Sequence, residues 1–342
     1  MDKNVTYIVA ILAVVSLVVA AYGLVTFQGQ IDDLNSSVDD IQQTLTTIQD
    51  QIDNYQPSSE DQEITLVDSM GNVVTLTSIP ERIVSLAPSN TEILFAIGAG
   101  ENVVGVTDFC DYPYNFTAWI ESGNLTSIGN YYGPSVEPIV ALNPDLVLAS
   151  SGSLEAAATL ADLGYNVLVV EGHTVDDILQ DILLVGRATG NNAEASALVT
   201  QMRARLDAVA AQLADATTTP KVYYEVWYEP LQSVGPETFI DEIITLAGGE
   251  NIFNDATTSW PTASSEEIIE KNPDVLVFPD TYMSQNYYDI DAVDDRPGWT
   301  TITAVQNGAI YEIDENLLVR SGPRVVDGVE TMAALIHPEI FG

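Results

Sequence analysis

Short apolar runs alternate along the chain with stretches of helical periodicity. The runs that we interpret as buried strands cover residues 82–86, 102–106, 146–149, 166–170, 222–228, 275–278 and 309–313. Helices are expected near 91–98, 154–162, 238–247 and 324–335. Ser89-Asn-Thr-Glu92 has the pattern of a capping box for the first of these helices. This alternation is typical of α/β domains with mainly parallel sheets.

One expected helix is much longer than the others. Residues 192–215 are rich in Ala, Leu and Gln, and their larger apolar side chains fall on one helical face. These side chains are Leu198, Met202, Leu206, Val209 and Leu213. The pattern predicts a single long helix between two lobes.

An internal repeat supports the division into two lobes. Residues 135–148 and 264–277 share Ser, Glu, Ile and Asn-Pro-Asp at identical spacings. In each copy we expect a Ser N-cap to begin a short helix, Asn-Pro to end it, and a buried strand to follow. A second pair of blocks precedes the copies: Glu92-Ile-Leu with Gly100-Glu-Asn-Val103, and Glu242-Ile-Ile with Gly249-Glu-Asn-Ile252.

The amino-terminal part has a different pattern. Val5 to Phe27 carries no charged residue, and as a helix at about 1.5 Å per residue it reaches about 35 Å. That length is sufficient for a hydrocarbon core of about 30 Å. Lys3 precedes the run, so the positive-inside tendency places the remainder of the chain outside the cell. A cleaved signal peptide is the alternative interpretation.

Heptad spacing follows the apolar run. Apolar residues recur at alternating intervals of three and four, at Ile31, Leu34, Val38, Ile41, Leu45, Ile48 and Ile52. This spacing predicts a coiled-coil stalk that would make the protein oligomeric. A single amphipathic helix lying on the protein's own body is the alternative.

Charge and composition narrow the function. The chain has 50 Asp and Glu residues against 10 Lys and Arg, a formal charge of −40, while 46% of its residues are hydrophobic. Such a polyanion is repelled by nucleic acids and anionic lipid surfaces, so a nucleic-acid partner is not expected. One cysteine and two histidines exclude a thiolate zinc site and a three-histidine site. Phosphate-loop, nucleophile-elbow and zincin motifs are missing, which favours a binding protein over an enzyme and predicts no metal site.

Several motifs together resemble one family. They are Arg82-Ile-Val-Ser-Leu-Ala-Pro-Ser-Asn-Thr-Glu92, Cys110-Asp-Tyr-Pro113, Asn143-Pro-Asp145, Gly248-Gly-Glu-Asn-Ile252, Trp260-Pro261 and Arg320-Ser-Gly-Pro-Arg324. The region from about 64 to 340 resembles solute-binding proteins of ABC importers for cobalamin, ferric siderophores and haem, the cobalamin-binding branch most of all. The resemblance implies two Rossmann-like lobes joined by one long rigid helix, with a ligand held in the cleft between them.

The expected organisation has six parts. They are a transmembrane anchor or uncleaved signal (1–28), a coiled-coil stalk (29–55), a linker (56–63), an N-terminal binding lobe (64–190), a connecting helix (191–216) and a C-terminal binding lobe (217–342). We therefore expect an α/β protein with two Rossmann-like lobes joined by one long helix, preceded by an N-terminal transmembrane helix and a coiled-coil stalk.

The repeat indicates candidate ligand-binding residues. Tyr131 and Trp260 each lie four residues before the N-cap serine of their copy, so equivalent loops bring one aromatic side chain from each lobe to the cleft. Paired aromatics suit a broad, flat ligand such as a corrinoid. The resemblance adds Tyr112 and Arg320 to this pocket. Trp227 and Tyr228 end a predicted strand and belong either to the pocket or to the core.

Two positions depart from the cobalamin pattern. Ser150 stands where the family's cobalamin binder has a tryptophan, and Asn316 stands where it has an aspartate. A different corrinoid, a haem or a ferric siderophore therefore stays open as ligand. The surplus of carboxylates disfavours anionic siderophores.

Acidic and amide side chains suggest two kinds of surface site. Glu137 and Glu266 occupy equivalent positions, and the resemblance implies that they dock onto arginines of the importer's membrane subunits. Their alternative role is to stabilise a helix dipole. Asn-x-Thr or Asn-x-Ser sequons at Asn35, Asn115 and Asn124 are candidate glycosylation sites.

The single cysteine and the two histidines are the remaining candidates for metal or ligand binding. Cys110 is either buried and inert or a thiolate ligand facing the cleft, His173 is expected in a loop, and His337 is expected to be structural.

The sequence thus predicts a membrane-anchored extracellular receptor, single-pass and non-enzymatic, that delivers a corrinoid-like ligand to an ABC importer. Two alternatives stay open. One is a haem or ferric-siderophore binder of the same fold, and the other is an oligomeric structural or adhesive protein of the cell surface.

Overall fold

The computed structural model describes residues 63–280 and 290–342. The predicted membrane span, the heptad stalk, most of the linker and Asn35 lie outside these residues. Within the described ranges, no helix combines the length and the apolar character that crossing a membrane requires.

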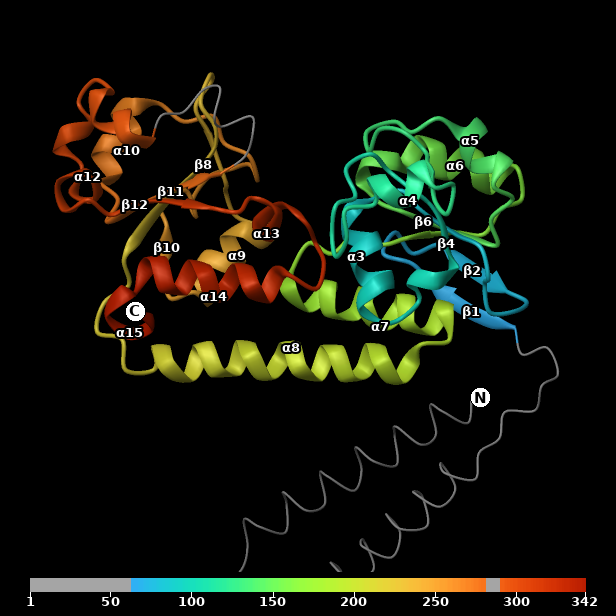
Figure 1. The fold of residues 1–342 in the computed structure, drawn as a ribbon. Helices are drawn as coiled ribbons and strands as arrows, with labels where there is room; N and C mark the ends of the chain where they lie inside the picture. Colours follow the sequence, from blue (N-terminus) through green and yellow to red (C-terminus); the bar gives the residue numbers. More distant parts are fainter. Residues whose placement is uncertain (1–62, 281–289) are drawn as a thin grey trace, which may run out of the picture. The chain divides into compact units, whose positions relative to one another are not determined.

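The N-terminal lobe, coloured from blue to green in Figure 1, is built on a parallel sheet with strand order β5-β4-β3-β6-β7. Its strands are β3 (Ile83–Ser85), β4 (Val103–Val106), β5 (Thr126–Ser127), β6 (Leu146–Ala149) and β7 (Val167–Val169). Its helices are α3 (Pro88–Ala96), α4 (Thr117–Glu121), α5 (Val136–Ala141), α6 (Leu154–Asp162) and α7 (Val175–Thr189). An antiparallel hairpin of β1 (Ile64–Val67) and β2 (Val73–Leu76) precedes them.

The C-terminal lobe has a second parallel sheet, with order β10-β8-β11-β12 and β9 pairing antiparallel with β8. The strands are β8 (Lys221–Trp227), β9 (Gln232–Ser233), β10 (Glu250–Asn251), β11 (Val275–Pro279) and β12 (Ile310–Ile313). The helices are α9 (Phe239–Leu246), α10 (Ser265–Lys271), α12 (Thr303–Asn307), α13 (Asn316–Val319), α14 (Val325–Ile336) and α15 (Pro338–Phe341). Short 3-10 helices lie at Ile290–Asp295 and Trp299–Thr301 in this lobe, and at Gly100–Asn102 and Ser151–Ser153 in the N-terminal lobe. The predicted α/β class with parallel sheets is confirmed.

The central strands are apolar because both faces of each sheet are covered. In β6, Leu146 and Leu148 pack into one hydrophobic cluster, and Val147 and Ala149 pack into the cluster on the opposite face. All four side chains are fully buried. This arrangement explains the continuous apolar runs, since a one-sided sheet would alternate with polar residues.

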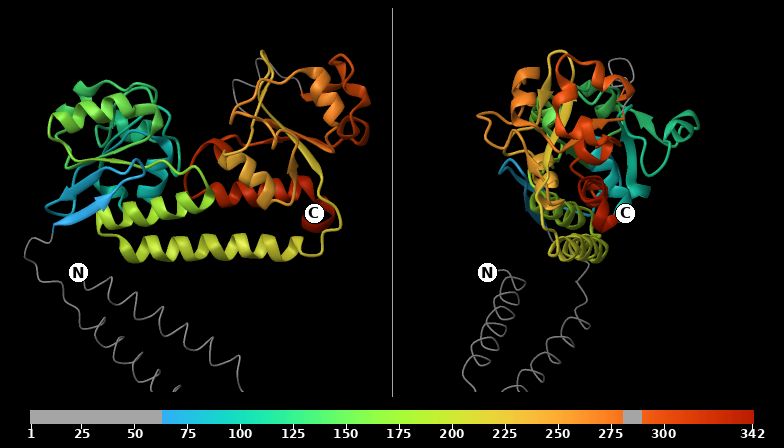
Figure 2. Two further views of the ribbon diagram at one scale, coloured as in Figure 1. Left: turned by 180° about the vertical axis from the view of Figure 1, so that it is seen from behind. Right: turned by 90° about the vertical axis from the view of Figure 1, so that its left-hand side faces the viewer.

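The expected long helix is α8 (Asn192–Leu213), which runs along both lobes (Figures 1 and 2). It packs against α7 of the N-terminal lobe and α14 of the C-terminal lobe. Met202 and Val209 of its predicted apolar face are buried, and Leu198, Leu206 and Leu213 are partly buried against the core. The helix therefore supports both lobes with one continuous surface.

The repeated Asn-Pro-Asp motif builds the same junction in each lobe. Asn143 and Asn272 end their helices with φ angles of 45° and 48°, in the left-handed region that asparagine tolerates. Asp145 then accepts hydrogen bonds from the backbone N–H groups of Glu81 and Arg82, each at 3.0 Å, just before β3. Asp274 accepts from Lys221 N–H at 2.9 Å, at the start of β8. The motif thus aligns neighbouring strands.

The predicted capping box at 89–92 is wrong. Pro88 takes the first helical position of α3 with Ala87 as N-cap, so Ser89 and Glu92 lie inside the helix. Proline starts the helix earlier because its fixed φ suits this position and it needs no N–H partner there. The Glu92 side chain therefore does not cap the start of α3.

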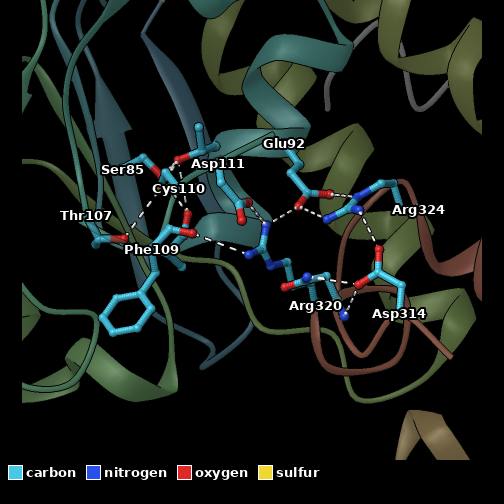
Figure 3. Close-up of polar contacts among 12 residues, drawn as sticks. Ser85, Glu92, Thr107, Phe109, Cys110, Asp111, Asp314, Arg320 and Arg324 are labelled. Carbon is cyan, nitrogen blue, oxygen red and sulfur yellow. Dashed lines mark hydrogen bonds and ion pairs between the residues drawn. The ribbon is translucent and has the colours of Figure 1, made fainter. Parts of the chain in front are cut away.

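Glu92 connects the two lobes. Its carboxylate lies between Arg320 and Arg324, which follow α13 in the C-terminal lobe (Figure 3). Arg320 Nη1 is 2.9 Å from Oε1, Arg324 Nη2 is 2.8 Å from Oε1, and Arg324 Nε is 2.9 Å from Oε2. The Glu92 side chain is 1% exposed and the two arginine side chains are 11% and 12% exposed. These charges are held in a low-dielectric environment, where losing one partner is costly.

The repeat provides a second contact between the lobes. Glu242, which corresponds to Glu92, lies in α9 of the C-terminal lobe. Its Oε2 accepts a hydrogen bond of 2.6 Å from the backbone N–H of Val175, at the start of α7. Each of the two equivalent glutamates therefore bonds to the opposite lobe.

Asp181 is a buried carboxylate with an incomplete set of partners. It lies in α7 and is 6% exposed. Its Oδ1 accepts from Ser69 Oγ at 2.9 Å, but Oδ2 has no partner in the described part of the protein. Burial raises the pKa of Asp181 to about 6, with a smaller contribution from Asp177 and Glu171, although the Ser69 hydrogen bond opposes the shift.

Replacing Glu92 by Gln is expected to destabilise the protein strongly. Two buried guanidinium groups would lose their shared counter-charge, at a cost of about 3–5 kcal/mol. Chemical denaturation of the full chain measures the loss. The matched control is Asp176→Asn, which breaks an ion pair with Arg203 whose side chains are 49% and 76% exposed, and it should cost less than about 1 kcal/mol. Equal losses in both variants would contradict the buried connection.

Asp181→Asn is expected to stabilise the protein at neutral pH. The folded-state pKa lies above the usual value of 3.8, so the folded form holds the proton more tightly and stability is lost as pH rises through about 4 to 6. The neutral amide removes this loss, on the order of 2–3 kcal/mol at pH 7.5. Unfolding free energies of wild type and variant across pH 4–8 should converge at low pH. The exposed Asp162→Asn serves as control, and a constant difference across the range would refute the assignment.

Candidate functional site

A cleft of about 470 Å³ lies between the two lobes. Its walls are segments that follow the carboxyl ends of strands in both sheets: residues 88–89 after β3, 150–151 after β6 and 315–316 after β12. In parallel sheets the carboxyl ends converge on one edge, which is where α/β proteins place ligands. The fold therefore predisposes this region to bind a solute.

Aromatic side chains dominate the cleft. The N-terminal lobe contributes Phe109, Tyr131 and Tyr132, and the C-terminal lobe contributes Tyr224, Phe239 and Trp260. Phe109 is 52% exposed, Tyr132 75% and Trp260 48%. Large aromatic side chains gathered and left accessible in one concave region are characteristic of a binding surface.

Tyr131 is held by a close backbone approach. A Cβ atom at Gly152 would lie 2.6 Å from the Tyr131 ring, so only glycine leaves room for the ring there. The Ser150 hydroxyl donates to the Tyr131 hydroxyl at 3.4 Å. Tyr131 also contacts Tyr132, with ring centroids 4.6 Å apart and an interplanar angle of 70°. The ring is thus positioned before any ligand arrives.

Arg320 brings a guanidinium group to the cleft wall. In addition to Glu92, its Nη1 bonds Asp111 Oδ1 at 2.7 Å, and its Nη2 donates to the carbonyl of Phe109 at 3.3 Å (Figure 3). Burial acts to lower the pKa of Arg320, but the hydrogen bonds and charges of Asp111 and Glu92 outweigh burial and raise it. The side chain therefore stays charged and is already paired.

The structure brings together three of the six predicted ligand-binding residues. Tyr131, Trp260 and Arg320 line the cleft. Ser150 and Asn316, the two departures from the cobalamin pattern, line it as well. These five positions come from both lobes and from segments almost 200 residues apart in sequence.

The other three candidates are not among the residues that line the cleft in the described part of the chain. The Tyr112 ring covers Arg324, whose Cζ lies 4.3 Å from the ring centroid. Tyr228 covers Arg296 in the same way at 4.4 Å. Trp227 Nε1 donates to the Glu229 carbonyl at 3.0 Å. The structure thus gives Trp227 and Tyr228 partners within the C-terminal lobe, whereas Tyr112 contacts an arginine of the opposite lobe.

Sequence reasoning missed four aromatic cleft residues: Phe109, Tyr132, Tyr224 and Phe239. Two of them were adjacent to recognised features, since Phe109 directly precedes the Cys-Asp-Tyr-Pro motif and Tyr132 follows Tyr131. Tyr224 lies within a strand and Phe239 begins a helix, so their patterns indicated only core positions.

Cys110 is 7% exposed and contacts the hydroxyls of Thr91 at 3.2 Å and Thr107 at 3.3 Å. Burial raises the pKa of its thiol, so it is neutral and not a cleft thiolate. His173 lies exposed in a loop. His337 is fully buried at the end of α14, with Nε2 3.1 Å from the Gly248 carbonyl. The described residues contain no cluster of His, Cys, Asp and Glu suited to a metal ion.

The predicted surface residues are accessible. Glu137 and Glu266 are exposed in the first turns of α5 and α10, at equivalent positions of the two lobes. Asn115 and Asn124 are exposed in the segment that lengthens the first repeat unit.

Comparisons with known proteins agree with this architecture. Residues 83–317 match the model of the family described as "Periplasmic binding protein". The chain is 34% identical over 286 residues to the Bacillus subtilis protein named "Uncharacterized ABC transporter substrate-binding lipoprotein YvrC", covering 81% of this chain and 87% of that one. It is 34% identical over 283 residues to a cobalamin-binding protein of Halobacterium salinarum, covering 80% and 74%.

Solved structures with the same fold include proteins named for two different ligands, haem and vitamin B12. The periplasmic haem-binding protein RhuT from Roseiflexus sp. RS-1 has a TM-score of 0.67 and 28% identity, over 75% of this chain and 98% of that one. The vitamin B12-binding protein BtuF of Vibrio cholerae has a TM-score of 0.64 and 27% identity, over 76% and 98%. The chain therefore belongs to the periplasmic binding protein family, whose members are non-enzymatic solute receptors of ABC importers for ligands of the B12, haem and siderophore type.

Proposed function

We propose that this protein captures a corrinoid, such as cobalamin, in the cleft between its lobes and delivers it to an ABC importer. One observation carries the proposal: aromatic side chains of both lobes, with Tyr131 and Trp260 at equivalent positions of the repeat, line a single cleft. Flat aromatic surfaces give a large contact area to a macrocycle at small entropic cost. The relatives named for cobalamin and vitamin B12 support the same ligand class.

Haem is the second candidate. The structural likeness to RhuT favours it, and the tyrosines of the cleft have a side chain that can coordinate haem iron. A corrinoid remains preferred because the described cleft residues include no histidine, methionine or cysteine as a further axial ligand.

The proposal includes anchoring and docking. The uncharged run from Val5 to Phe27 supports a single membrane anchor, with the lobes on the outer side of the membrane. Glu137 and Glu266, exposed on one helix of each lobe, support a two-point contact with basic residues of the importer.

Titration of the full-length chain with cobalamin, cobinamide, haem and ferric chelates tests the ligand. We expect a corrinoid to bind with a micromolar or lower dissociation constant. Absorbance spectroscopy and calorimetry measure this binding. Trp260→Ala and Tyr131→Ala should each weaken it about tenfold, because each removes an aromatic contact worth roughly 1–1.5 kcal/mol. Trp119→Ala, an exposed tryptophan of α4 outside the cleft, is the control. If only haem or only a ferric chelate binds, the corrinoid proposal is wrong and that compound becomes the proposed ligand. If none of the four compounds binds, the solute-binding role is rejected.

The double variant Glu137→Arg, Glu266→Arg tests docking. Reversing both charges should reduce cellular uptake of the ligand at least tenfold, since like charges would meet at the importer, while binding in solution stays unchanged. The control is Glu155→Arg, Glu270→Arg, which alters an exposed glutamate in each lobe. Normal uptake by the first variant, or equal impairment of both, would refute docking through these residues.

A further inference from the structure

The cleft is poor in positive charge. Of the described residues that line it, Arg320 is the basic one, while Glu171 and Glu315 are acidic. Residues 281–289 contain no Lys or Arg in the sequence, so that segment has no cation to add. A ligand that enters the cleft meets a single guanidinium group among carboxylates.

That guanidinium group is already neutralised. Arg320 Nη1 lies between the carboxylates of Glu92 and Asp111, and Nη2 donates to the Phe109 carbonyl. Arg324 shares Glu92 and lies 3.7 Å from Asp314. Two arginines therefore face three carboxylates, a local balance of +2 − 3 = −1. A ligand carboxylate that approached Arg320 would lie beside the carboxylates already paired with it, and their repulsion would offset the attraction of the guanidinium group.

The remaining polar groups on the cleft wall are uncharged. Ser150, Ser151, Asn316 and the Tyr131 hydroxyl supply both donors and acceptors. Primary amides pair well with such groups because each amide both donates and accepts. Carboxylates only accept, and their larger desolvation cost is increased here by repulsion from Glu171 and Glu315.

We infer that the cleft selects a macrocycle whose peripheral groups are uncharged amides and rejects the same macrocycle bearing carboxylates, and that Asp111 is the specificity-determining residue. The inference rests on the proposed solute-binding function and specifies the ligand class. Asp111 acts through Arg320: it neutralises the guanidinium group from the inserted segment of the N-terminal lobe.

Asp111 is distinguished from Glu92 by its surroundings. The side chain of Asp111 is 62% exposed and its ion pair is with Arg320, whereas Glu92 is 1% exposed and holds both arginines. Replacing Asp111 therefore changes the charge at Arg320 and leaves the buried connection between the lobes intact. Asp111 therefore affects ligand specificity, whereas Glu92 affects the stability of the contact between the lobes.

The test uses two corrinoids with the same ring: cobyrinic acid heptaamide and cobyrinic acid, in which every amide is a carboxylate. The full-length wild-type chain should bind the heptaamide more than tenfold more tightly at low ionic strength. Asp111→Asn should reduce this ratio roughly fivefold through tighter binding of the acid, because removing one carboxylate raises the local balance from −1 to 0 and the ligand carboxylates are repelled less at partly buried Arg320. Added salt should strengthen binding of the acid to wild type, and it should do so less in the variant, where there is less repulsion to screen.

Glu121→Gln is the matched control. It also changes the net charge by one unit, from an exposed position in α4 of the same inserted segment, and it should leave the ratio unchanged. Equal binding of the two corrinoids by wild type, or an unchanged ratio in Asp111→Asn, would overturn the selectivity. If wild type binds neither corrinoid nor haem, the proposed function itself fails, and the two failures are thereby distinguished.

Discussion

Glu92 places a buried carboxylate of the N-terminal lobe between two arginines of the C-terminal lobe, and the position of the cleft depends on this contact. A buried charge tolerates no loose geometry, because every oxygen left without a donor is costly in a low-dielectric environment. Glu242 makes the reciprocal contact with the start of α7. Together with α8, which packs against both lobes, these contacts fix the separation of the two aromatic walls.

The internal repeat divides into parts that build the lobes and parts that differentiate them. Asn-Pro-Asp forms the same strand junction twice, so its duplication reflects architecture. The segment that lengthens the first unit has no counterpart in the second, and it supplies Phe109 to the cleft and Asp111 to Arg320. The cleft therefore combines equivalent positions of the two copies, Tyr131 and Trp260, with residues that only the first copy has.

Basic residues are scarce, and those inside the molecule are used for structure. Arg296 pairs with the fully buried Glu225, Arg205 lies between Asp327 and Glu330 to join α8 with α14, and Arg324 pairs with Glu92. The excess acidic residues lie mainly on solvated surface, which suits surroundings of high ionic strength because screening reduces self-repulsion. A net charge of −40 and a cleft of low positive charge are thus consistent with each other.

Local sequence patterns determined the fold class, the central strands of both sheets, the long helix and the internal repeat, because burial of both sheet faces and of one helix face leaves a regular hydrophobic period. They also predicted Tyr131 and Trp260 at the cleft, where the structure has them, since the repeat sets their equivalence. The tertiary structure alone decided the role of Glu92: Pro88 moved the helix start, and the partner Arg320 lies 228 positions away. It likewise placed Tyr112 over Arg324 and buried Cys110 between two threonines. Contacts between distant segments depend on how sheets and helices pack in three dimensions, and a periodicity measured along the chain carries no record of them.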